Sequence, residues 1–294
     1  MRRYLHALSV VRGTSGGRKL AAMAASPATR RPLFEFRLRD VAEIVPWGPP
    51  ERPTLSWFGL TDGWFWMNVG DGELFRTRER PGERPSGFAY VDYQVVRLWE
   101  DVLELLPRAM APVPSDIATR LESLEDWLAW FAGFRDRLAE TASEVDADPY
   151  ELAAKWATDR WLHTAYLVRG TRIFVWRTDD TMHVAWENRH RIDDDGSPTW
   201  SSAKGHVSMT IEDFVQEARD FNSRLMAAMA ERIASVRTSW PHPGVMIDLV
   251  QLDDEQEQRS TWLTRALQAP AEEDWEAVRE ALRRFEDTNA AGSS

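Results

Sequence analysis

The sequence predicts an α+β fold in which antiparallel β-hairpins pack against amphipathic helices. Two observations favour this class. Short apolar runs meet at turn residues such as Gly70-Asp71-Gly72, and longer stretches carry an apolar stripe behind a capping residue. Strands followed by a capped helix occur twice, at about 55–106 and about 166–236, which allows two similar units. A chain of 294 residues is long enough to bury a sizeable core.

The first 32 residues differ in charge from the rest. Met1–Pro32 contains seven basic residues and no acid, whereas the remaining chain carries 29 basic and 47 acidic residues, a net charge of −18. The segment shows no helical or strand periodicity, so we expect it to be disordered. Three interpretations stay open: a twin-arginine export signal, a basic arm for anionic partners, and an over-extended gene start with Met23 as the true beginning. The gene start is favoured because the apolar run Ala7–Val11 is too short for an export signal.

The first half of the body is predicted to begin with an edge strand, Leu33–Arg39, in which apolar and charged residues alternate. The Asp62-Gly63 pair predicts a hairpin turn between two apolar runs, and Gly70-Asp71-Gly72 predicts a second turn. Asp92 stands where a helix cap is needed, and the apolar stripe of the helix behind it ends at Pro107.

Three further helices are predicted after Pro107. Ser123 and Asp126 have the spacing of a capping box and predict a helix start. Pro149 is favoured in the first turn of the next helix. This helix is predicted to continue to Ala165, with apolar residues on nearly all of its sides. Thr210 is expected to cap a long amphipathic helix.

A second hairpin is predicted between these helices. Asp179-Asp180 has the composition of a two-residue turn, which would set Trp176 opposite His183. We expect that pair to serve packing.

The expected organisation is a basic arm or over-extended start at 1–32, an α+β body at 33–250, and an acidic helical segment with a tail at 251–294. Two sub-units within the body, 33–145 and 148–250, remain an option. Gln251–Asp287 carries 11 acids and five arginines, so we expect two acidic, solvated helices there.

Composition and motifs exclude several classes of function. The chain has no cysteine, which excludes disulfides, thiol nucleophiles and iron–sulfur clusters. It has no phosphate loop, dinucleotide fingerprint, zinc-binding spacing or nucleophile elbow, so no cofactor and no metal is expected. The acidic body lacks a basic stripe for phosphates, so nucleic acid is not an expected partner. No apolar run approaches the ~20 residues of a membrane span.

His163 is the titratable residue of most interest. On a continuous helix it would lie four residues from Asp159 on the same face, and an imidazole oriented by a carboxylate in an aromatic pocket can act as a general base. The favoured interpretation is a hydrogen-bonded core histidine, because the sequence offers no accompanying nucleophile or second base.

Trp64 and Trp66 lie two residues apart on a predicted strand and share a face, while Phe65 and Met67 share the other. With both faces apolar, either helices cover the sheet on both sides or one face binds a ligand. The packed core is the favoured alternative.

Several segments together resemble an uncharacterised bacterial family, a domain of unknown function found largely in actinobacteria. The resemblance covers about Leu33 to Arg237 and is carried by Phe34-Glu35-Phe36, Pro46-Trp47-Gly48, Leu55-Ser56-Trp57-Phe58-Gly59-Leu60-Thr61-Asp62-Gly63 and Tyr90-Val91-Asp92-Tyr93-Gln94-Val95-Val96-Arg97-Leu98-Trp99-Glu100-Asp101. It implies a stand-alone cytoplasmic protein that starts just before the Phe-Glu-Phe strand, and it implies no activity.

The candidate binding residues come from these segments and from the tryptophan strand; they are Trp57, Asp62, Trp64, Trp66, Asp92 and Arg97. Turn chemistry explains Asp62, and helix capping explains Asp92. Arg97 is expected to pair with Asp101 one helical turn further on, an exposed pair worth about 0.3–0.5 kcal/mol.

We expect a non-enzymatic protein-binding module, such as an immunity- or antitoxin-like protein, that takes a basic protein partner. The alternative is a small-molecule-binding or hydrolytic enzyme with a tryptophan-lined cleft that uses His163 and Asp159. A cytoplasmic protein is expected, and the oligomeric state stays open.

Overall fold

The computed structural model describes residues 31–78, 88–141, 148–242, 244–268 and 271–292. The expected N-terminal arm lies almost wholly outside these ranges. Pro32–Ser294 forms one compact unit. Within the described residues, no helix combines the length and apolar character that a bilayer crossing requires.

The first sheet consists of β1 (Phe34–Leu38), β2 (Asp62–Val69), β3 (Gly72–Leu74) and β4 (Val91–Gln94). All pairings are antiparallel; β1 lies along one side of β2, and β3 and β4 share the other. The predicted edge strand and the turn before Gly72 are confirmed, and Gly70 adopts the φ of +59° that this turn needs.

The predicted hairpin at Asp62-Gly63 is wrong. Residues Gly59–Thr61 form a short 3₁₀ helix, η2, and Asp62 is the first residue of β2. Another 3₁₀ helix, η1 (Val41–Glu43), follows β1. The run 55–60 is therefore a buried lead into β2 and not a partner strand.

Helix α1 (Val95–Met110) follows β4 without a loop. The predicted cap at Asp92 is wrong, because Asp92 belongs to β4 and Gln94 occupies the N-cap position, where its side chain makes no capping hydrogen bond. Pro107 does not end the helix but lies in its last turn. The predicted apolar stripe is buried in the main core, which lies between the two sheets, α1 and α5.

The second sheet has the order β5 (Ile173–Thr178), β6 (Thr181–Glu187) and β7 (Lys204–Thr210). Its predicted hairpin is confirmed, with Trp176 opposite His183. Alternate residues of β5 enter different cores: Ile173 and Val175 join the main core, whereas Phe174 and Trp176 join a second one. This sheet is therefore covered on both faces.

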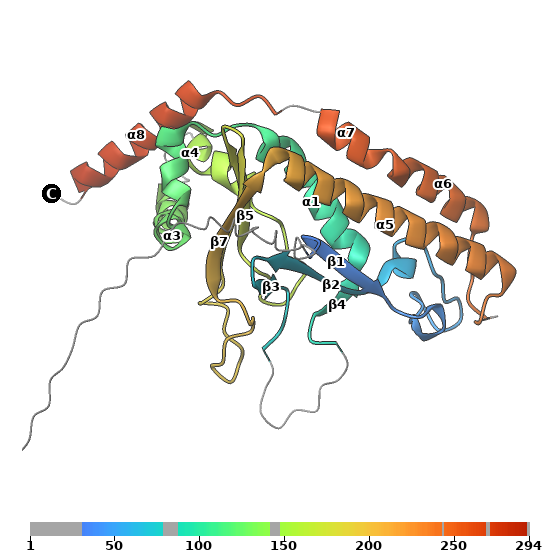
Figure 1. Cartoon of the computed structure of the whole chain (residues 1–294). Coiled ribbons are helices and arrows are strands. Elements are labelled where there is room, and N and C mark those ends of the chain that lie inside the picture. Colours follow the sequence, from blue (N-terminus) through green and yellow to red (C-terminus); the bar gives the residue numbers. More distant parts are fainter. Residues whose placement is uncertain (1–30, 79–87, 142–147, 243, 269–270, 293–294) are drawn as a thin grey trace, which may run out of the picture. The chain divides into compact units, whose positions relative to one another are not determined.

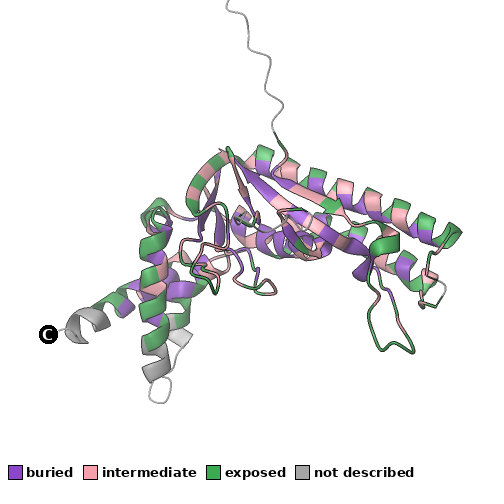
Figure 2. Cartoon of the chain, turned by 90° about the horizontal axis from the view of Figure 1, so that it is seen from below, coloured by how far each residue is buried: buried purple, intermediate pink, exposed green. Residues whose placement is uncertain are grey.

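Helix α5 (Ile211–Thr238) packs along β1 and next to α6, as Figure 1 shows. Its predicted start is confirmed, since the Thr210 hydroxyl accepts from the backbone N–H of Asp213 over 3.1 Å. Its inward stripe is buried and its outer face is exposed (Figure 2).

The second core is built by helices that follow α1 and by the last helix of the chain. The elements are α2 (Ser115–Ala118), the 3₁₀ helix η3 (Thr119–Leu121), α3 (Leu124–Thr141), α4 (Asp148–Thr158) and α8 (Trp275–Gly292). The predicted cap of α3 is confirmed, because the Ser123 hydroxyl accepts from the N–H of Asp126 over 3.3 Å.

The prediction that the helix from Pro149 continues to Ala165 is wrong. The helix ends at Thr158, and the next residues pair with β5: Leu162 N–H donates to the Ile173 carbonyl over 2.9 Å, and Val175 N–H donates to the Arg160 carbonyl over 2.8 Å. Pairing with a sheet edge replaces further helical turns.

The C-terminal segment is not a pair of solvated helices. It contains α6 (Leu249–Ser260), α7 (Trp262–Gln268) and α8, and each buries apolar side chains, among them Leu252, Leu263 and Phe285. Many of its acids are neutralised locally; ion pairs join Asp253–Arg237, Glu255–Arg259, Glu273–Arg108, Glu276–Arg279, Glu280–Arg284 and Glu286–Arg120.

Candidate functional site

The two faces of the first sheet differ sharply. Phe65 and Met67 are buried in the main core, whereas Trp64 and Trp66 on the opposite face are only half-buried. The register places Arg37 opposite Trp64, and so on this outer face. We call the outer face with its flanking residues the aromatic face; its members are Arg37, Arg39, Asp62, Trp64, Trp66, Phe88, Tyr90 and Asp92.

Arg39 organises one end of the aromatic face. Its Nε donates to Oδ2 of Asp62 over 2.8 Å, and its Nη2 donates to Oδ2 of Asp92 over 2.7 Å. The guanidinium group lies 4.4 Å from the ring centroid of Trp64, within cation–π distance. The hydrogen bond that Arg39 donates to the Asp92 carboxylate is the main reason that the pKa of Arg39 is raised. One cation thus joins β1, β2 and β4 above the sheet.

Aromatic rings cover the other end. Trp66 stacks on Tyr90 with 4.2 Å between ring centroids, and Phe88 lies 5.6 Å from Trp64. The guanidinium of Arg37 stands 4.9 Å from the ring of Phe88, which is 37% exposed. Such rings offer a large contact area with little conformational entropy to lose.

The structure brings four of the six candidate binding residues together here: Asp62, Trp64, Trp66 and Asp92. Trp57 does not belong to the group, because it is fully buried and its Nε1 donates to Gln256 over 2.8 Å. Four members of the face were not predicted from the sequence; they are Arg37, Arg39, Phe88 and Tyr90. The alternation of basic residues in the first strand was the available signal.

Arg97, the sixth candidate, lies on α1 and is half-exposed. It pairs with Glu100 over 2.9 Å and not with Asp101, so the predicted partner is wrong. Its guanidinium also lies 5.1 Å from the ring of Tyr166.

Asp101 is an uncommon group, a carboxyl that is only 5% exposed. The Tyr166 hydroxyl donates to its Oδ2 over 2.8 Å. Burial raises the pKa of Asp101 to about 7, and the hydrogen bond from Tyr166 and the charge of Arg97 only partly oppose this effect.

Two cavities adjoin Asp101, and we call them together the Asp101 cleft. The larger, of about 460 Å³, lies between α1 and α7 and is lined by Arg97, Glu100, Asp101, Leu103, Glu104, Trp262, Arg265 and Ala266. The smaller, of about 250 Å³, is lined by Asp101, Glu104, Leu105, Arg108, Lys155, Asp159, Trp161 and His163. Asp101 and Glu104 line both.

His163 and Asp159 therefore line one cavity, although they do not share a helix. Asp159 accepts from Nζ of Lys155 over 2.7 Å and lies 3.6 Å from Nε of Arg108. His163 is exposed, so the favoured interpretation as a core histidine is wrong. In the described ranges, no three histidine, aspartate or glutamate side chains gather as a metal-ligand set.

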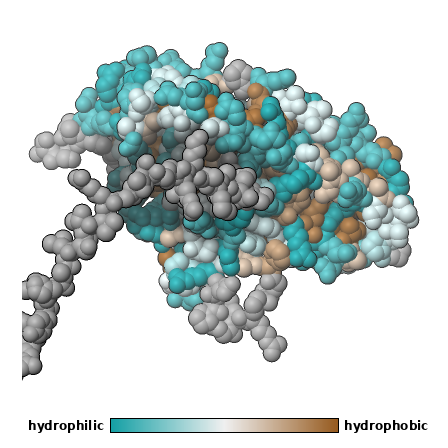
Figure 3. Space-filling view, in the orientation of Figure 1, coloured by the Kyte–Doolittle hydropathy of each residue, from teal (hydrophilic) through white to brown (hydrophobic). Residues whose placement is uncertain are grey.

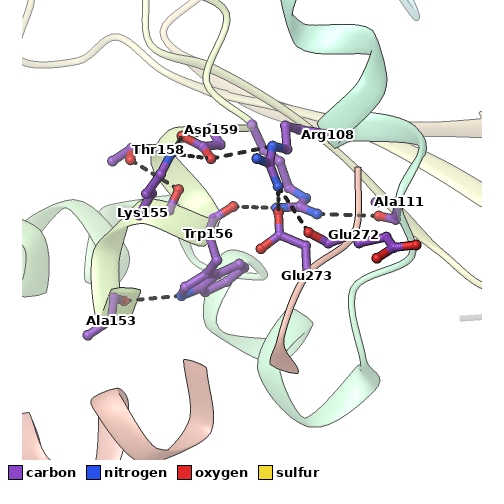
Figure 4. Close-up of polar contacts among 10 residues, drawn as sticks. Arg108, Ala111, Ala153, Lys155, Trp156, Thr158, Asp159, Glu272 and Glu273 are labelled. Carbon is purple, nitrogen blue, oxygen red and sulfur yellow. Dashed lines mark hydrogen bonds and ion pairs between the residues drawn. The ribbon is translucent and has the colours of Figure 1, made fainter. Parts of the chain in front are cut away.

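A buried arginine, Arg160, stands in sequence between Asp159 and Trp161, which line the smaller cavity. Its Nη1 donates to the carbonyl of Trp156 and lies 3.4 Å from Oε1 of Glu273, which Arg108 also contacts over 2.8 Å. In Figure 4 the guanidinium of Arg108 points toward the carboxylate of Glu273. Burial lowers the pKa of Arg160. This network joins the segment before α8 to the end of α4 and has a structural role.

Comparison with known protein families matches residues 33–281 to a family of unknown function, DUF5984. No curated protein and no solved structure matches the chain. The matched range includes both sheets, α1, α5 and most of the C-terminal helical segment. The match spans well over half of the chain, and the protein belongs to the DUF5984 family.

Proposed function

We propose that the protein binds another protein and that the aromatic face forms the contact. The observation that supports this is the gathering of Trp64, Trp66, Tyr90 and Arg37 on the face of a sheet that points away from its core. Tryptophan, tyrosine and arginine are the residues that most often dominate the energy of protein–protein contacts. The rigid sheet beneath would hold these side chains ready for a partner.

The partner that fits best is basic. The chain beyond Pro32 has a net charge of −18, and a charge of this size attracts an oppositely charged protein and raises its association rate. Most of the visible surface is hydrophilic, with small apolar patches (Figure 3). The acidic charge favours a cytoplasmic protein that acts without catalysis, in the manner of an immunity protein or an antitoxin.

The test is a comparison of capture by the full-length wild type and by the double variant Trp64→Ala, Trp66→Ala, from a lysate of the source organism. Trp47→Ala is the matched control, because Trp47 is 48% exposed and packs on Phe58, which is not a member of the aromatic face. The partner should be retained by the wild type and the control and lost by the double variant.

The captured protein is then purified and its association rate is measured at about 0.05 M and 0.5 M salt. A basic partner should associate at least ten times faster at low salt, since the Debye length shortens as salt rises. A partner that the double variant still binds, or an acidic partner, would contradict the proposal.

A second candidate is a small-molecule-binding or hydrolytic enzyme that uses His163 and Asp159. The observation that favours it is the 250 Å³ cavity that both residues line together with Trp161 and Asp101. His163→Gln and Asp159→Asn should then abolish turnover of small ester and amide substrates while the fold persists. Equal turnover by the variants would rule out this use of the cavity.

A further inference from the structure

Asp101 is a buried acid whose charge has no direct counter-ion. In the described part of the chain, no cation is in ion-pair contact with it. The nearby arginines are engaged elsewhere: Arg97 with Glu100 over 2.9 Å, and Arg108 with Glu273 over 2.8 Å. A buried ionised carboxylate without a cation is costly, and such groups in a cavity are frequently functional.

The larger cavity has the chemistry of a site for a small cation. Arg97 and Glu100 in the cavity lining pair with each other. The other charged residues of the lining are Asp101, Glu104 and Arg265, so acidic residues outnumber basic ones there. Leu103 and Ala266 add apolar wall. Its volume of about 460 Å³ falls within the usual range of small-molecule sites, roughly 300–1,000 Å³.

We propose that the Asp101 cleft binds a small organic amine, whose ammonium group pairs with the carboxylates of Asp101 and Glu104. Residues that are three or four positions apart on a helix have their side chains on one face. Asp101 and Glu104 are three positions apart, so both carboxylates can contact one ligand. Tyr166 positions Asp101 by holding Oδ2, and the second oxygen is left to accept from the ligand. This site lies apart from the aromatic face and does not depend on partner binding.

Amine binding at Asp101 is linked to release of its proton. Asp101 holds its proton up to about pH 7 in the free protein, because burial raises its pKa. An ammonium ligand needs the ionised form, so binding near pH 6 should release a proton into the buffer. The charged and titratable groups around Asp101 come from α1, α4, the segment after α4, and α7; they are Arg97, Glu100, Glu104, Arg108, Lys155, Asp159, His163, Tyr166 and Arg265.

The experiment is calorimetric titration of the full-length protein with butan-1-amine and butane-1,4-diamine, with butan-1-ol as the uncharged control. Each amine is titrated at about pH 6 in two buffers of different ionisation enthalpy, and again at about pH 8. The amines should bind and the alcohol should not, affinity should rise at least tenfold between the two pH values, and close to one proton should be released at pH 6.

Asp101→Asn is the decisive variant, because it keeps the shape and an acceptor for Tyr166. It should lose amine affinity at least tenfold and release no proton, and an unchanged near-UV circular dichroism spectrum shows that it is folded. Glu231→Gln, an exposed acid on α5, is the matched control and should bind like the wild type. Failure of both amines to bind, or equal binding by Asp101→Asn, would overturn the proposal.

Discussion

The hydroxyl of Tyr166 donates to Oδ2 of Asp101 over 2.8 Å and couples the segment after α4 to the middle of α1. Tyr166 is held in turn by stacking on Tyr93, with 4.9 Å between ring centroids. The bond stabilises the ionised form of Asp101, yet burial still raises its pKa to about 7. The carboxyl is therefore kept where it changes charge near neutral pH.

The first prediction concerns the pH dependence of stability. The pKa of Asp101 is about 7 in the folded protein against 3.8 in the unfolded chain, so the native state binds the extra proton between about pH 4 and pH 7. Its contribution to the free energy of unfolding should fall across that window as pH rises and stay low above it. Asp101→Asn should abolish the fall, and at pH 8 it should be the more stable protein by at most about 4 kcal/mol.

Urea unfolding of both proteins at pH 4, 6 and 8 measures this difference. Glu231→Gln controls for loss of an exposed carboxylate and should show no such trend. An Asn variant that is less stable than the wild type at pH 8 would mean that Asp101 is ionised and well paired in the native state.

The second prediction concerns Arg160. The side chain is fully buried, contacts Glu273 and lies 5.3 Å from the ring of Trp275. Arg160→Ala removes these contacts and leaves a cavity, so it should cost about 3–5 kcal/mol of unfolding free energy. Hydrogen exchange should accelerate most in residues 275–287.

Arg283→Ala is the control, since the Arg283 side chain is 67% exposed and pairs with Glu280 on its own helix. Its loss should cost less than about 1 kcal/mol. A similar small cost for Arg160→Ala would show that the buried network does not hold α8 in place.

The third prediction concerns two glycines. A Cβ on Gly63 would lie 2.3 Å from the carbonyl oxygen of Arg37 and 2.8 Å from Cα of Leu38, so Gly63→Ala must push β1 away from β2. We expect a loss of at least about 2 kcal/mol. A Cβ on Gly133, in α3, meets nothing within 4 Å, so Gly133→Ala should stabilise by about 0.5–1 kcal/mol. Thermal unfolding of the two variants should therefore shift in opposite directions.

The fourth prediction concerns the N-terminal segment. The compact unit begins at Pro32, and β1 begins two residues later. A chain that starts at Met23 should melt within about 5 °C of the full chain. A larger fall in melting temperature, measured by differential scanning calorimetry, would show that the removed residues stabilise the body.

Much of the fold follows from local chemistry and could be predicted. Turn residues such as Gly70 and Asp179-Asp180, and capping residues such as Ser123 and Thr210, act on neighbours a few positions away. The end of α4 could not be predicted this way. It depends on pairing of residue 162 with β5, which follows in sequence but whose position is set by the tertiary fold.

The members of the candidate site that depend on tertiary contacts could not be predicted from the sequence either. The strand alternation predicted that Trp64 and Trp66 share a face. Their neighbour Arg39 directly follows β1 and their neighbour Asp92 lies on β4, each more than 20 residues away along the chain. Asp92 satisfied the rule for a helix cap, and only the register of β4 against β2 shows that its carboxylate serves Arg39 instead. The Asp101 cleft was missed because a single acid among apolar helix positions gives no sign of its tertiary surroundings.

The bonds from Arg39 to Asp62 and Asp92 also protect the alignment of an edge strand. Sliding β1 by one residue along β2 would carry Arg39 away from both carboxylates and turn Phe34 and Phe36 from Phe221 towards water. The loss of the Arg39 ion pairs and the exposure of two phenylalanines thus both oppose a shift of β1 along β2. A partner pressing on the aromatic face would meet strands that resist shearing, so binding there would leave the pairing of the sheet intact.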